Sequence, residues 1–64
     1  IGSQPPMVVF KGWNHGFLSR LDIDVDPKGL SRYVIVLMSG KELTGFHGFN
    51  EIKLINEDGT IDYL

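Results

Sequence analysis

The chain contains no cysteine, which excludes disulfide bonds, cysteine-rich zinc sites and thiol catalysis. Long apolar runs are also missing: the longest, Tyr33 to Met38, is far shorter than the roughly 18 residues of a membrane-spanning helix. No charge dominates, because six basic and eight acidic residues give a net charge of −2, which supplies no general attraction to nucleic acid. We therefore expect a soluble, cytoplasmic protein.

The first six residues include two prolines and lack the basic start and apolar stretch of a secretory signal. Proline and the residue before it favour extended backbone, so we expect residues 1–6 to be a disordered leader outside the fold, derived from an expression tag. Residues 7–64 are expected to form one small domain. A chain of this size buries only about 60% of the surface that it exposes when unfolded, so its core must be small.

Glycine and proline interrupt the sequence so evenly that little room is left for helices. Leu21, Ile23 and Val25 alternate with aspartates, as in a half-buried strand. The segment Leu30 to Met38 becomes continuously apolar and rich in β-branched side chains, which indicates a central strand covered on both faces. The predicted strands are 7–13, 17–26, 30–38, 41–46, 51–56 and 60–64, separated by turns at 14–16, 27–29, 39–40, 48–50 and 58–59.

Connections this short require neighbouring strands to be antiparallel, because a parallel pair needs a crossover of about a dozen residues. Gly12 and Gly45 fall inside predicted strands, where glycine marks a bulge or a sharp bend. The sequence therefore predicts an all-β fold. We expect a small five- to six-stranded antiparallel meander that closes into an SH3-like or Sm-like barrel or forms a strongly curved sheet.

Both histidines belong to a repeated tripeptide, His-Gly-Phe, at 15–17 and 47–49. The repeat leaves an internal duplication and a shared site as open alternatives. Two histidines supply half of a zinc coordination sphere, but their spacing specifies no further ligand. We interpret each histidine as a turn residue, with glycine giving backbone freedom and phenylalanine anchoring the loop in the core. No metal and no cofactor are expected.

Three alternating acids, Asp22, Asp24 and Asp26, have the spacing that opens an EF-hand calcium loop. The remainder of that loop is missing, since Pro27 replaces the required glycine and Tyr33 replaces the required glutamate. We interpret the acids as a solvated face that opposes edge-to-edge aggregation, with docking of a basic partner as the alternative. The serines match no nucleophile motif, so no catalytic residue and no enzyme activity are predicted.

The segment Tyr33 to Gly45, with the sequence Tyr-Val-Ile-Val-Leu-Met-Ser-Gly-Lys-Glu-Leu-Thr-Gly, resembles the opening of the first Sm motif. In that family an apolar strand turns at a glycine into a second strand, which holds another glycine where the barrel bends. The characteristic N-terminal helix of the family has no counterpart here, and two predicted strands precede the segment instead of one. The resemblance implies barrel-like bending and, as an alternative function, binding of single-stranded RNA.

The leading hypothesis is a non-enzymatic protein-interaction or regulatory module, which acts on a protein partner or on its own copies through an exposed strand edge and apolar surface. By analogy, phages and other mobile elements use small factors of this character. The alternative is an Sm-like or OB-like barrel that stacks single-stranded RNA or DNA on aromatic side chains beside basic ones. The candidate binding residues are Trp13, Asn14, His15, Phe46, His47 and Phe49.

Overall fold

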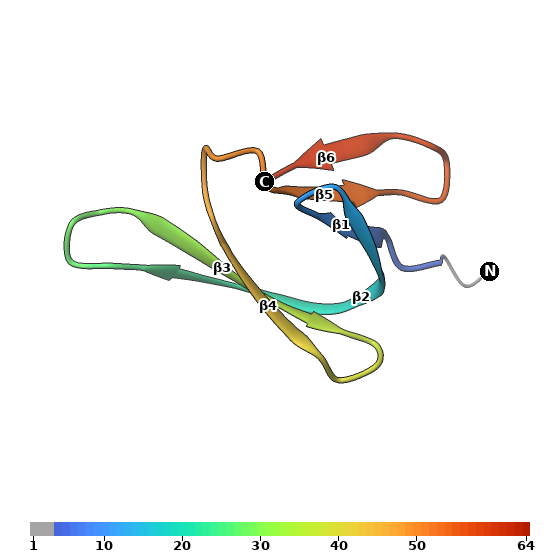
Figure 1. The fold of residues 1–64 in the computed structure, drawn as a ribbon, viewed down its shortest axis with the longest axis horizontal. Helices are drawn as coiled ribbons and strands as arrows, with labels where there is room; N and C mark the ends of the chain where they lie inside the picture. The colour runs from blue at the N-terminus through green and yellow to red at the C-terminus, as the bar shows by residue number, and fades with distance from the viewer. Residues whose placement is uncertain (1–3) are drawn as a thin grey trace.

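The computed structural model describes residues 4–64, which form six β-strands and no helix. Neighbouring strands are antiparallel throughout, and they form one sheet in the order β4-β3-β2-β1-β5-β6 (Figure 1). The all-β prediction is therefore confirmed. The strands are β1 (Met7–Phe10), β2 (Trp13–Val25), β3 (Ser31–Leu37), β4 (Glu42–Phe46), β5 (Ile52–Ile55) and β6 (Ile61–Tyr63).

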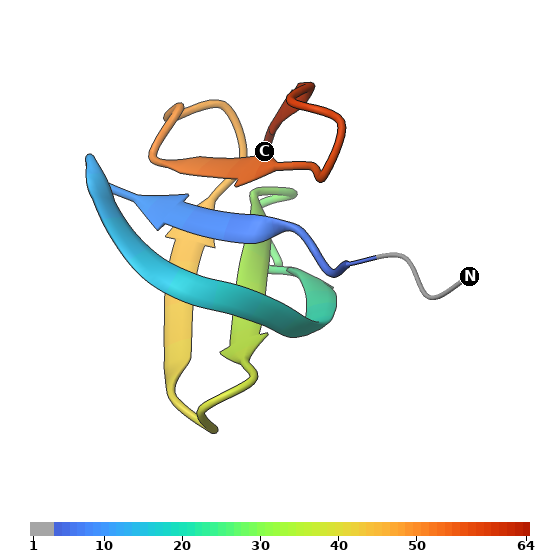
Figure 2. The ribbon, with the colours of Figure 1, turned by 90° about the vertical axis from the view of Figure 1, so that its right-hand side faces the viewer.

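The sheet is strongly curved and does not close into a barrel, because β4 and β6 remain as its two edges. Of the two predicted forms, the curved sheet is the observed one and the closed barrel is wrong. The order also departs from a simple meander, since β5 pairs with β1 and not with β4. Figure 2 shows the consequence: β1 and β5 run across β3 and β4 at a steep angle, so the sheet folds over itself.

The long strand β2 makes this fold possible because it pairs with β1 through its first half and with β3 through its second half. Its register is interrupted opposite Val8 and Val9, where Gly16 adopts a φ of +111°, and again between Leu18 and Arg20. Glycine reaches positive φ at little cost, and bulges of this kind bend and twist a strand. The two interruptions therefore turn the sheet along β2.

The predicted turn at 14–16 was wrong, because these residues belong to β2. The chain reverses earlier, at Lys11 and Gly12, with φ angles of +51° and +84°. Two consecutive residues at positive φ are the signature of a tight hairpin turn that matches the twist of its strands. Gly12 therefore serves the β1–β2 turn, whereas the sequence placed it inside a strand.

The core lies between the two halves of the folded sheet. Its central strand is β3, which lies between β2 and β4 and buries Tyr33, Ile35 and Leu37 on one face. Val34 and Val36, on the other face, are half-buried. The prediction that this segment forms the core strand is thus confirmed, whereas the expected covering of both faces is wrong, because only one face is buried and β3 is second from the edge of the sheet. The buried cluster consists of Val8, Tyr33, Ile35, Leu37, Ile52 and Leu54.

The β2–β3 hairpin projects beyond the rest of the sheet (Figure 1). Ile23 and Val25, toward the tip of this projecting hairpin, are 63% and 61% exposed. The predicted half-burial therefore fails for these two side chains and holds for Leu21. Asp26 closes the turn, since its carboxylate accepts hydrogen bonds from the backbone N–H groups of residues 28 and 30, each at 2.9 Å.

The predicted leader, 1–6, falls partly outside the described residues, which begin at Gln4. From there the chain already contacts the domain. The backbone N–H of Gln4 donates to the carboxylate of Glu57 at 3.0 Å, and the carbonyl of Pro6 accepts a hydrogen bond from the N–H of Leu18 at 2.9 Å. Two hydrogen bonds therefore connect residues 4–6 to the domain. The origin of residues 1–6 from an expression tag stays a prediction.

At Gly45 the two halves of the sheet approach each other closely. A Cβ atom at Gly45 would lie 2.9 Å from Cγ1 of the fully buried Ile52, closer still to its Cδ1, and 3.3 Å from the Phe10 ring. We predict that Gly45→Ala lowers the free energy of unfolding by about 1–3 kcal/mol through overpacking. Chemical denaturation of the single variants and of Gly45→Ala/Ile52→Val should show a double variant less destabilised than the sum of the singles. An unchanged midpoint for Gly45→Ala would contradict the close approach.

Candidate interaction surface

The six predicted binding residues do not form one site. Trp13 and Asn14 lie together at the start of β2, and the indole of Trp13 is 74% exposed, as the sequence suggested. Phe46 ends β4, and Phe49 follows in the loop before β5 with its ring centroid 6.0 Å from that of Phe46. Phe49 is 61% exposed, so the prediction that it anchors the loop in the core is wrong.

The two histidines lie in different surroundings. His15 is in β2 and packs edge-on against Phe10, with ring centroids 6.0 Å apart. His47 lies in the loop after β4, where its Nδ1 is 3.0 Å from the hydroxyl of Tyr33. The two His-Gly-Phe segments therefore occupy unlike positions in the fold. Within residues 4–64 no three His, Asp or Glu side chains gather as a metal ion would require.

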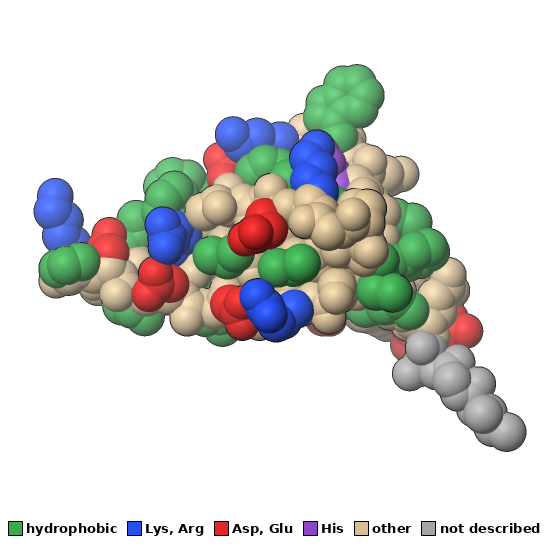
Figure 3. Space-filling view, turned by 90° about the horizontal axis from the view of Figure 1, so that it is seen from below, with side chains coloured by type: hydrophobic (Ala, Val, Ile, Leu, Met, Phe, Trp, Pro, Cys, Tyr) green, Lys and Arg blue, Asp and Glu red, His purple; other side chains and the backbone are tan. Residues whose placement is uncertain are grey.

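Basic side chains are dispersed over the described surface. The Lys11 ammonium lies 5.3 Å from the Phe10 ring centre, and that of Lys53 lies 5.6 Å from the ring centre of Tyr63. Both arginines form ion pairs: Arg20 with Asp22 at 3.0 Å and Arg32 with Asp24 at 2.8 Å. Figure 3 shows blue side chains separated by red and green ones, with no continuous basic area on that face.

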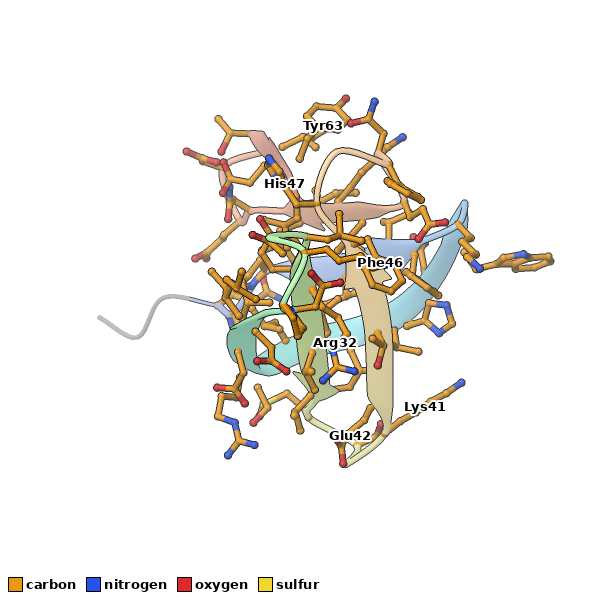
Figure 4. All side chains as sticks on the ribbon, turned by 90° about the vertical axis from the view of Figure 1, so that its left-hand side faces the viewer. Arg32, Lys41, Glu42, Phe46, His47 and Tyr63 are labelled. Carbon is orange, nitrogen blue, oxygen red and sulfur yellow. The ribbon has the colours of Figure 1, made fainter. Side chains whose placement is uncertain are left out.

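A hollow forms where the projecting hairpin passes the end of β4, and we call it the hairpin hollow. Cross-strand register places Asp24, Arg32 and Phe46 in one row across β2, β3 and β4. Figure 4 shows Arg32 and Phe46 side by side on this face. The lining residues are Asp24, Val25, Asp26, Pro27, Arg32 and Phe46.

The hairpin hollow combines an apolar wall with a charged one. Phe46 provides the aromatic side, and the exposed Phe49 lies against Phe46 outside the lining. Val25 belongs to the lining, but it alternates with Asp24 along β2, so its side chain points to the other face of the sheet. The Asp24–Arg32 pair is partly exposed, so solvent screens it and its contribution to stability is at most about 1 kcal/mol. This arrangement suits an apolar side chain flanked by polar backbone or charge. It brings together no nucleophile and base.

A second hollow lies at the β5–β6 turn and is polar, lined by Gln4, Asn56, Glu57, Asp58 and Thr60. Its groups bond to one another. The amide of Asn56 donates to the Thr60 hydroxyl at 3.0 Å and to the carboxylate of Asp62 at 3.1 Å, and that hydroxyl donates to Asp58. We interpret the polar side chains of this hollow as structural, because they hydrogen-bond to one another and stabilise a tight turn.

Val25, Pro27 and Arg32 were absent from the residues predicted to bind. Asp24 and Asp26 were predicted only as part of an acidic face, with docking of a basic partner as its alternative role. A signal for one pair was present, because an antiparallel hairpin turning at 27–29 places Asp24 opposite Arg32, as observed. The approach of Phe46 and Phe49 carried no such signal, since it depends on the path of the loop between β4 and β5. Exposure of Val25 depends on how far the hairpin projects beyond the rest of the sheet.

Comparison with known proteins finds no matching family model, no matching curated protein and no matching solved structure. The resemblance to the Sm motif therefore stays a prediction. In the part of the chain that the structure describes, no helix has the length and apolarity to cross a membrane.

The β5–β6 turn yields a prediction for Asp58. The hydroxyl and the backbone N–H of Thr60 donate to its carboxylate at 2.6 and 3.0 Å and hold the pKa of Asp58 below its ordinary value of 3.8. A depressed folded-state pKa stabilises the fold above pH 3.8, and this contribution is lost as the pH falls through the lower value. Carboxyl NMR titration should show an upward pKa shift in Thr60→Val and little change in Thr60→Ser. An unchanged pKa in Thr60→Val would contradict this account.

Proposed function

We propose that this protein is a non-enzymatic interaction module that binds a protein partner at the hairpin hollow. The observation that carries the proposal is the exposure of apolar side chains around this hollow. Phe46 lines the hollow at the end of β4, and Phe49, which is 61% exposed, has its ring centroid 6.0 Å from that of Phe46. Val25, toward the hairpin tip, is also 61% exposed. Burial of such side chains is the main favourable term in protein association, and aromatic anchors often contribute most of it.

A protein partner fits this surface better than a nucleic acid. Nucleic-acid binding depends on neutralising several phosphates with lysine and arginine side chains. Here the arginine at the hollow is already paired with Asp24, and Asp26 adds a further acid to the lining. The dispersed lysines provide no track along which a phosphate backbone could run. The surface supports apolar contact bordered by charge, which is typical of a protein interface.

The test uses crosslinking and affinity capture with the wild-type chain and two matched variants. Phe49→Ala removes an exposed aromatic side chain that lies against Phe46 beside the hollow, whereas Met38→Ala removes a 66% exposed side chain from the β3–β4 turn. We predict a protein that wild type and Met38→Ala retain equally and that Phe49→Ala retains about tenfold less, equivalent to about 1.4 kcal/mol.

Equal retention by all three chains would contradict the proposal. Retention of single-stranded oligonucleotide, with affinity falling steeply as salt rises, would favour the RNA- or DNA-binding alternative instead. Trp13→Ala serves as a further control for apolar exposure, because Trp13 does not line the hollow and, unlike Phe49, makes no ring contact with Phe46.

A further inference from the structure

Strand β4 offers a free sheet edge. It pairs with β3 on one side and has no strand beside it on the other side in the described chain. Its pairing with β3 runs without a register shift from Glu42 to Phe46, and the strand contains neither proline nor lysine. Proteins usually protect an exposed edge with such residues or with a bulge. The edge of β4 has no proline and no bulge, and its one charged residue is Glu42 at its start.

The hydrogen-bond alternation of an antiparallel pair fixes which backbone groups of β4 point outward. The N–H of His47 donates to the carbonyl of Ser31 and the N–H of Leu37 to the carbonyl of Lys41, each at 2.9 Å. Counting in twos from these bonds assigns positions 43 and 45 to the ladder with β3. The N–H and C=O groups of positions 42, 44 and 46 therefore face away from the sheet.

These outward groups are arranged symmetrically about Thr44. If two β4 strands lie antiparallel with Thr44 opposite Thr44, Glu42 of each copy lies opposite Phe46 of the other. All three outward positions of one copy then meet the three of the second copy. This register forms three hydrogen-bonded residue pairs, with about six backbone hydrogen bonds in total.

The side chains are compatible with this register. Thr44 meets its own copy, and paired threonines are favourable cross-strand neighbours. Leu43 of one copy lies opposite Gly45 of the other, which has no side chain to obstruct it. Glu42 has no ion pair among the described residues and would lie next to Phe46 of the second copy, in the same row as that copy's Arg32. No two like charges face each other across the axis.

The opposite edge of the sheet is less suited to self-pairing. The hydrogen bonds from Asn56 to Thr60 and from Leu64 to Ile52 assign the outward backbone groups of β6 to Ile61 and Tyr63 alone. With only two outward positions, β6 cannot place one of them on a two-fold axis and still pair an outward residue on each side of it. Figure 4 shows the open run of β4, from Phe46 at one end to Glu42 and Lys41 at the other.

We propose that two copies of this chain associate through their β4 edges, antiparallel and centred on Thr44, to form one continuous sheet of twelve strands about a two-fold axis. Such a closed isologous contact stops at two copies. This inference does not rest on the partner-binding function, because it is argued from the backbone edge of β4. The two surfaces share Phe46, which lines the hollow and lies opposite Glu42 of the second copy.

Charge substitution at Thr44 provides the test, with sedimentation equilibrium of the full chain as the measurement. Wild type is expected to sediment as a dimer, at twice the monomer mass of 7.2 kDa. Thr44→Lys places two like charges opposite each other, as does Thr44→Glu. The dimer affinity of each variant alone should fall by at least about tenfold. An equimolar mixture of the two variants should recover the dimer, because lysine then faces glutamate.

Ser19→Lys adds the same charge at an exposed position on β2, away from the edge, and should leave the dimer intact. A measurement without substitutions keeps the proposal testable if a variant fails to fold. In a mixture of isotope-labelled and unlabelled wild-type chains, intermolecular NOEs should connect Thr44 with Thr44 and Glu42 with Phe46. A monomer at millimolar concentration, a ring of more than two copies, or a dimer insensitive to both Thr44 variants would overturn the proposal.

Discussion

The bend in β2 is the feature on which the rest of this structure depends. A sheet of a few short strands, with no helix among residues 4–64, has nothing to cover its apolar face unless it folds onto itself. Gly16 and the irregularity before Arg20 let β2 serve both halves of the sheet. The halves then meet closely enough that only glycine fits at position 45, against the buried Ile52.

The folded-over sheet leaves some backbone groups without hydrogen-bond partners and some apolar side chains in solvent. Because the sheet folds over without closing, two edges keep free backbone groups, and the hairpin that continues past β4 keeps apolar side chains in solvent. Both the hairpin hollow and the free edge arise at β4. The hollow forms where the β2–β3 hairpin passes the end of β4, and the edge is free because β4 is the last strand of the sheet on that side. Their chemistry differs: side-chain burial at the hollow, and backbone pairing at the edge. The two surfaces meet at Phe46, which lines the hollow and lies opposite Glu42 of the second copy in the proposed dimer.

Much of the fold was predictable because it depends on local patterns. Period-two alternation and turn glycines located the strands from Leu30 onward to within one or two residues, and the apolar run around Ile35 identified the core strand. The prediction placed the turn at 14–16 and a strand glycine at Gly12, whereas the structure has the turn at Lys11 and Gly12 and the strand glycine at Gly16. Glycine occurs at both places, so the sequence does not distinguish them. Whether the sheet closes into a barrel depends on long-range packing that no local pattern encodes. The hairpin hollow exists because the sheet stays open, so it could not be predicted either. Of the predicted binding residues, only Phe46 lines the hairpin hollow, with Phe49 beside it.

Amide hydrogen exchange along β4 in dilute solution, where the chain is monomeric, tests the central claim that the sheet is open at this edge. The account predicts an alternating pattern, with fast exchange at Glu42, Thr44 and Phe46 and slow exchange at Leu43 and Gly45, whose N–H groups bond to β3. Uniformly slow exchange from 42 to 46 in the monomer would show that β4 has a second neighbour within the chain. That result would contradict the open sheet and both surfaces derived from it.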